Sequence, residues 1–106
     1  MDWNEFQILN NMKMVKKEIA LKELQVIPGV GKSIAGDLWN IGIRKVNDLA
    51  GKSPVKLYEK LNQFSGVRND ICVLYTFRCA VYYATESKHE KRKLKWWYWK
   101  NQIYID

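Results

Sequence analysis

Apolar residues recur at helical spacing over most of the chain. Residues 3–26 carry two such sets, which predicts a helical region made of two segments; the sets are Trp3, Phe6, Ile8, Leu9 and Met12, then Val15, Ile19, Ala20, Leu24 and Ile27. Pro28 cannot continue a helix and disfavours helical backbone at the residue before it, so the region ends there. A second helix is expected over residues 31–40, with Gly42 as its left-handed C-terminal residue.

The second half of the chain predicts two more helices and a short helical turn at residues 46–49. Ser53 is a good N-cap and Pro54 suits the first helical position, so a helix is expected from there to residue 64. The helix expected over residues 69–85 is apolar around most of its circumference, which favours a central position in the fold. Only residues 102–105 form a weak strand candidate. The predicted class is all-α, with about five or six helices.

The connection between the first two helices is the turn Pro28-Gly29-Val30-Gly31. Glycine permits positive φ and lets a ligand or another backbone come close. The N–H groups of residues 29–33 are expected to lack intrahelical partners, and the helix dipole adds partial positive charge there. Because Lys32 and Ser33 can add an ammonium and a hydroxyl, the pattern predicts a cradle for a backbone phosphate. The alternative is a tight helix connection whose amides are hydrated.

The same pattern recurs in a degenerate form. Residues 61–72 repeat residues 24–35 position by position; matched pairs are Gly29 with Gly66 and Val30 with Val67, and the departures are Ser65 for Pro28 and Arg68 for Gly31. The Arg68 side chain weakens a close backbone approach, although its guanidinium can reach a phosphate instead. The first turn is therefore the better candidate for binding. Gly66 and Arg68 stay as secondary candidates, in a turn expected to be mainly structural.

Length and charge narrow the picture further. A chain of 106 residues supports one domain, 1–106, which divides into four segments: 1–23, N-terminal and helical; 24–60, the first repeat; 61–85, the second repeat; and 86–106, basic and Trp-rich. The formal net charge is +7, and residues 88–100 hold six Lys or Arg against one Glu. Such a cluster favours a polyanionic partner, with a solvated surface as the alternative.

The chain shows no apolar run of membrane-spanning length and no secretory signal, so a cytoplasmic protein is expected. Cys72 and Cys79 lie too far apart on one helix for an unstrained disulfide and are expected to be reduced, buried thiols. His89 is the only histidine, and neither zinc-ligand spacing nor a Ser/His/Asp set is present. We therefore expect no catalytic residue, metal, cofactor, membrane or small-molecule substrate.

Two further features leave alternatives open. Arg78 lies inside the apolar helix, where a structural ion pair or a helix-cap contact is favoured over a ligand role; the candidate partners are Asp37, Asp48 and Glu59. The Trp-rich segment is expected to cover a small core with the side chains of Trp96, Trp97 and Trp99. They can also stack on unpaired bases or form a protein-docking patch.

Residues 24–38 resemble the helix-hairpin-helix motif, and with the repeat at 61–75 the chain resembles its tandem form, a compact SAM-domain-like bundle. Three stretches are also similar to a small bacterial pathogenicity-locus family, sometimes labelled mitomycin-resistance-like, over about residues 20–100; they are residues 34–39, 70–83 and 94–100. The resemblance implies DNA binding through loop amides and the setting of DNA repair, recombination or replication. The Gly-Pro-Asp element of the glycosylase members is absent.

These observations lead to one expected function and one alternative. The expected function is sequence-independent binding of DNA backbone through residues 28–33, with RNA as a further candidate ligand. The alternative is an adaptor that binds a protein partner through exposed aromatic side chains.

Overall fold

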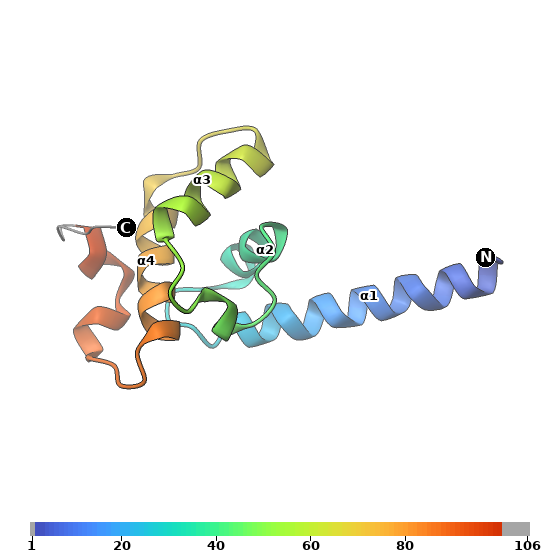
Figure 1. Ribbon diagram of the computed structural model, residues 1–106, viewed down its shortest axis with the longest axis horizontal. Coiled ribbons are helices and arrows are strands. Elements are labelled where there is room, and N and C mark those ends of the chain that lie inside the picture. Colours follow the sequence, from blue (N-terminus) through green and yellow to red (C-terminus); the bar gives the residue numbers. More distant parts are fainter. Residues whose placement is uncertain (1, 101–106) are drawn as a thin grey trace.

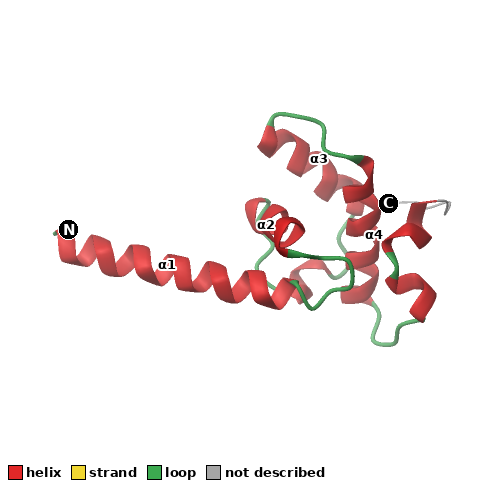
Figure 2. Cartoon of the chain, turned by 180° about the vertical axis from the view of Figure 1, so that it is seen from behind, coloured by secondary structure: helices red, strands yellow, loops and turns green. Residues whose placement is uncertain are grey.

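The computed structural model describes residues 2–100, and within these residues the secondary structure consists of helices joined by turns and loops, with no strand (Figures 1 and 2). It contains the α-helices α1 (Trp3–Leu24), α2 (Lys32–Asn40), α3 (Pro54–Ser65) and α4 (Ile71–Thr85). Three 3-10 helices follow the same labelling: η1 (Val46–Leu49), η2 (Lys91–Leu94) and η3 (Trp96–Lys100). The all-α class is confirmed, with fewer α-helices than predicted. The strand candidate at 102–105 lies outside the described residues.

Helices α3 and α4 begin where the sequence supplies a side-chain cap. The Ser53 hydroxyl accepts from the Lys56 N–H at 3.2 Å with Pro54 at the first helical position, as predicted for α3. The Asp70 carboxylate accepts from the Cys72 N–H at 2.8 Å at the start of α4. Helix α3 ends at Gly66, whose φ of +72° is a left-handed conformation that glycine adopts without strain.

Helix α1 differs from the prediction. It is one continuous helix and not two segments, because residues 3–24 contain no glycine or proline to interrupt it. The elements from α2 to η3 form the body of the molecule, and only the last turn of α1, where Ala20 and Leu24 are buried, packs on it. Residues 3–19 are exposed and project away from the body (Figures 1 and 2). The first apolar set of the sequence therefore lies in solvent and not in the core.

The core lies where α4 meets the other elements of the body. Helix α4 packs against α3, η1 and η3, which confirms its predicted central position (Figure 1). The largest fully buried side chains come from almost every element; among them are Leu24, Leu38, Leu49, Leu61 and Phe77. The end of α1 packs on α2, so the connection between these two helices is anchored on the body.

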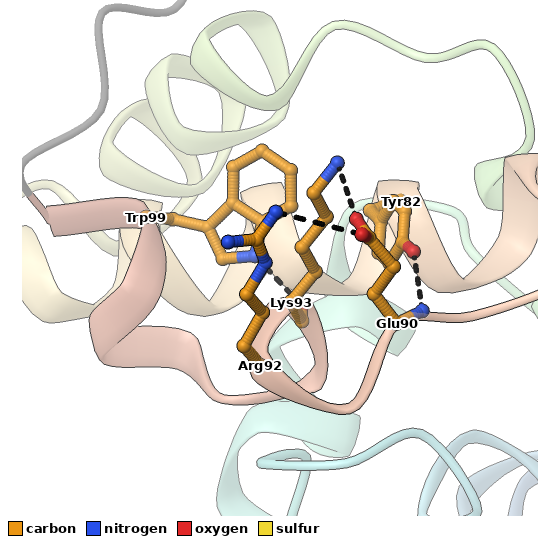
Figure 3. A network of polar contacts seen from close by, with 5 residues as sticks. All are labelled: Tyr82, Glu90, Arg92, Lys93 and Trp99. Atoms are coloured by element: carbon orange, nitrogen blue, oxygen red, sulfur yellow. Dashed lines mark hydrogen bonds and ion pairs between the residues drawn. The ribbon is translucent and has the colours of Figure 1, made fainter.

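The C-terminal segment returns along α4 and is fixed there by a polar network (Figure 3). The Trp99 Nε1–H donates to the Lys93 carbonyl at 3.0 Å, and the Trp99 ring lies 5.5 Å from that of Tyr82. The Glu90 N–H donates to the Tyr82 hydroxyl at 3.0 Å, while the Glu90 carboxylate pairs with the Lys93 ammonium at 2.8 Å. Trp99 is buried and Trp97 is exposed, so the expected cover over the core holds for one and not the other.

Candidate nucleic-acid interface

The first turn reverses the chain between α1 and α2 through a compact bond pattern. The Ile27 N–H donates to the Leu24 carbonyl at 3.2 Å, and the Val30 N–H donates to the Ile27 carbonyl at 3.0 Å. Gly29 has φ +83°, the conformation that requires glycine. Ile27 and Val30 are buried, at 1% and 4% exposure, and they hold the turn on the body while Gly29 and Gly31 stay at the surface.

The amides that remain for a ligand belong to the first turn of α2. The Val30 N–H is used within the turn, and the first backbone bond of α2 runs from the Ala35 N–H to the Gly31 carbonyl at 2.9 Å. The N–H groups of residues 32–34 precede that bond and have no intrahelical acceptor. Gly31 is the N-cap residue and has no side chain with which to cap them. Three amides and the positive end of the helix dipole thus coincide with the exposed side chains of Lys32 and Ser33.

The two glycines have different physical roles. A Cβ on Gly29 would lie 3.6 Å from the Trp96 Cδ1 atom, so this side of the turn rests on the C-terminal segment. A Cβ on Gly31 would meet no atom within 4 Å, and its φ of −89° suits any residue. The expected need for glycine therefore holds for Gly29, because of its φ of +83°, and not for Gly31. At Gly31 the missing side chain leaves open space in front of the amides.

The contact at Gly29 joins the turn to the aromatic cluster of the C-terminal segment. The Trp96 ring meets the exposed Trp97 ring edge-on at 5.8 Å, and the Lys95 ammonium lies 5.7 Å from the centre of the Trp97 ring. No sequence signal links residue 29 to residue 96, because the contact depends on how the segment folds back along α4.

The second turn is built differently from the first. The apolar residues that match Ile27 and Val30 are Phe64 and Val67, and they are 61% and 63% exposed. Side-chain amides hold the turn in place of apolar burial: the Asn62 Oδ1 atom accepts from the Asn69 N–H and from its Nδ2, each at 2.8 Å. The repeat is thus a sequence pattern that the packing does not follow.

The N-terminus of α4, which follows this turn, carries a carboxylate that the N-terminus of α2 lacks. The Asp70 carboxylate accepts from the Cys72 N–H in the first turn of α4, and this hydrogen bond lowers the pKa of Asp70 below its usual value. An anion at this end would meet a carboxylate and not open N–H groups. Arg68 is exposed beside it, and Gly66 has positive φ as the C-cap of α3.

The other residues singled out in the sequence, namely Arg78, Asp48 and the two cysteines, make contacts within the fold or lie away from the first turn. The Arg78 Nη1 atom donates to the Trp99 carbonyl at 3.3 Å, and the Asp48 carboxylate accepts from the Arg44 N–H at 2.9 Å. Cys79 is buried, and burial raises its pKa to about 11. Cys72 is exposed, which corrects the expectation of two buried thiols. Within residues 2–100 no cluster of side chains is suited to a metal ion, and no helix is long and apolar enough to cross a membrane.

Comparison with known proteins adds two findings. The family model described as Cdd1, pathogenicity locus, matches residues 17–103. The chain is also similar to the mitomycin resistance protein McrB of Streptomyces lavendulae, with 37% identity over 59 residues. That alignment covers 56% of this chain and 56% of McrB, so the chain spans little more than half the length of this relative. No solved structure matches the chain.

Proposed function

The chain belongs to the pathogenicity locus family, as its sequence resemblance indicated, and we propose that it is a DNA-binding protein of the helix-hairpin-helix type. In this proposal α1 with α2 and α3 with α4 form the two motifs of a tandem. The contact is made by residues 28–33 with the phosphate backbone and has no sequence preference. It is a binding function, and the proposal includes no catalytic step.

One contrast carries the proposal: two helices follow turns that match in sequence, and only one of the helices has a side-chain cap. Helix α4 begins at Asp70, whose carboxylate accepts from the Cys72 N–H, whereas α2 begins at Gly31 and has no side-chain cap. A phosphate oxygen at α2 would take the place that the carboxylate has at α4. Lys32 beside these amides and the net charge of +7 favour the same ligand.

The aromatic cluster near the first turn favours DNA with unpaired bases as the ligand. Trp96 lies against Gly29, and its neighbour Trp97 is exposed with the Lys95 ammonium over its ring. An exposed indole can stack on an unpaired base while a nearby ammonium meets the adjoining phosphate. Single-stranded and forked DNA therefore belong in the test beside duplex DNA.

The test is a fluorescence anisotropy panel at low salt with duplex, single-stranded and forked DNA and an RNA of matched length. The proposal expects binding to DNA that does not depend on base sequence. Trp97→Ala is expected to weaken binding to single-stranded or forked DNA more than binding to duplex. No binding to any DNA at low salt would refute the proposal, and binding to RNA alone would replace its ligand.

A second candidate function, an adaptor for a protein partner, is favoured by the exposed apolar side chains around the second turn. Phe64, Val67 and Ile71 are all exposed there, although their counterparts at the first turn are buried or half-buried. If no nucleic acid binds and Phe64→Gln or Trp97→Ala abolishes capture of a purified partner, the adaptor function is favoured. A role in DNA repair or processing stays an expectation. The name of the relative refers to mitomycin resistance and does not mention DNA repair.

A further inference from the structure

The projecting part of α1 exposes more apolar surface than a helix in water tolerates well. Helix α1 has 22 residues, and only its last turn packs on the body (Figures 1 and 2). Helices of this length gain most of their stability from packing an apolar face, and not from intrinsic propensity. Residues 3–19 have no such packing within the described chain, so a partner for this helix would stabilise it.

The exposed apolar residues include a regular stripe. Ile8, Met12, Val15 and Ile19 follow one another at intervals of four, three and four residues, the spacing of positions that face a second helix in a coiled coil. Each of the four is between 51% and 64% exposed. The stripe borders two hollows of the surface. One is a shallow groove lined by Ile8, Met12 and Val15, and the other is a pocket lined by Ile19, Trp39 and Arg44, so the stripe runs from the projecting part to the body.

The next positions of the same spacing carry opposite charges. Three residues before Ile8 lies Glu5, and three residues after Ile19 lies Lys22. If a second α1 runs antiparallel, Ile8 faces Ile19, Met12 faces Val15 and Glu5 faces Lys22, at both ends of the pair. A parallel pair in the same register would place Glu5 against Glu5 and Lys22 against Lys22, which is repulsive at both ends. The stripe is therefore complementary to an antiparallel copy of itself.

We propose that α1 pairs with α1 of a second copy of this chain as an antiparallel two-helix coiled coil. The register places the first turns of the second helix over the pocket lined by Ile19, Trp39 and Arg44, so the body of each copy covers the end of the pair. Within that pocket the Arg44 guanidinium stacks on the Trp39 ring at 3.6 Å. The two bodies then lie at opposite ends of the helix pair.

The first experiment measures the mass of the full chain by sedimentation equilibrium over a range of concentrations. We expect twice the monomer mass of 12.6 kDa at high concentration. Met12→Glu places a charge in the stripe and should raise the dimer dissociation constant at least about tenfold. Met14→Glu is the matched control, because Met14 is 63% exposed on a different face of the same helix and the substitution is identical. Thermal unfolding followed by circular dichroism verifies that the remaining helices stay folded in both variants.

A second set of variants tests the direction of the pair. Glu5→Lys or Lys22→Glu alone places like charges opposite each other in the antiparallel register and should weaken the dimer, while the double variant should restore it. In a parallel pair each single substitution leaves like charges facing like, so neither the loss nor the rescue is expected. A monomer at all concentrations, an equal effect of Met12→Glu and Met14→Glu, or a double variant without rescue would overturn the proposal.

Discussion

The substitution Gly31→Asp gives the first turn the cap that the second turn has. Gly31 has extended backbone that any residue adopts, and nothing lies within 4 Å of the position of its Cβ. An aspartate there can accept from the open amides of α2 in the way that Asp70 accepts from the Cys72 N–H. The substitution should therefore stabilise the fold and close the phosphate site in one step.

Both effects have an expected size. Replacing glycine by aspartate at an N-cap adds a few tenths of a kcal/mol, and a negative charge at this end adds about 0.3–1 kcal/mol through the helix dipole. For a domain of this size the sum corresponds to a rise in Tm of about 3–6 °C. A lost charge-assisted hydrogen bond costs about 1.5–3 kcal/mol, so binding to DNA should weaken roughly 10- to 150-fold.

Thermal unfolding followed by circular dichroism measures the first effect, and anisotropy with a labelled duplex measures the second. The control is Gln7→Glu, which adds the same charge on the exposed part of α1 far from the turn. A Gly31→Asp variant that gains stability and binds DNA like Gln7→Glu would refute the assignment of the phosphate site. A variant with a lowered Tm would refute the reasoning that α2 lacks a cap.

Three further predictions concern single residues. Lys32→Gln should lower the salt dependence of duplex binding by about one unit of slope, as expected for one lost phosphate contact, and a salt titration measures it. Gly29→Ala should destabilise the fold by about 1–2 kcal/mol in urea unfolding because of the φ of +83° beside Trp96; a neutral effect would contradict that strain. The pKa of Asp70 is lowered by its bond to Cys72, so its charge stabilises the fold above its usual value of 3.8 and ceases to do so as pH falls through the lower folded value. The difference in Tm between wild type and Asp70→Asn should therefore shrink on acidification, and a constant difference would contradict this.

The sequence predicted what local chemistry decides. The cap at Ser53 and Pro54 and the reversal after Pro28 depend on residues close to one another, so the patterns determine them. The central place of α4 followed from a helix that is apolar on most sides. Open amides were expected at residues 29–33; the Val30 N–H bonds within the turn instead, and the amides that precede the first bond of α2 belong to residues 32–34.

Other features depend on which surfaces meet, and periodicity does not specify that. The stripe of α1 has the pattern of a core helix, but the core is filled by other elements and the stripe is left in solvent. The contact of Trp96 with Gly29 arises from the way the C-terminal segment folds along α4. Val30 and Val67 occupy matching positions of the repeat, yet side-chain amides hold the second turn and Val67 is exposed while Val30 is buried.

If both proposals hold, a dimer would present two phosphate-binding turns. Two linked contacts raise the affinity for a ligand long enough to reach both, without any new contact. Met12→Glu should then weaken binding to a long duplex and leave binding to a short one unchanged, relative to Met14→Glu. Equal binding by the two variants at all lengths would show that the pair has no part in holding DNA.

The most direct test of the central claim is a salt titration of duplex binding by the wild-type chain. If the first turn and its basic neighbours neutralise about two to four phosphates, log K should fall linearly with log salt at a slope of about −2 to −4. A slope near zero, or no binding at the lowest salt, would contradict binding to the DNA backbone through this turn.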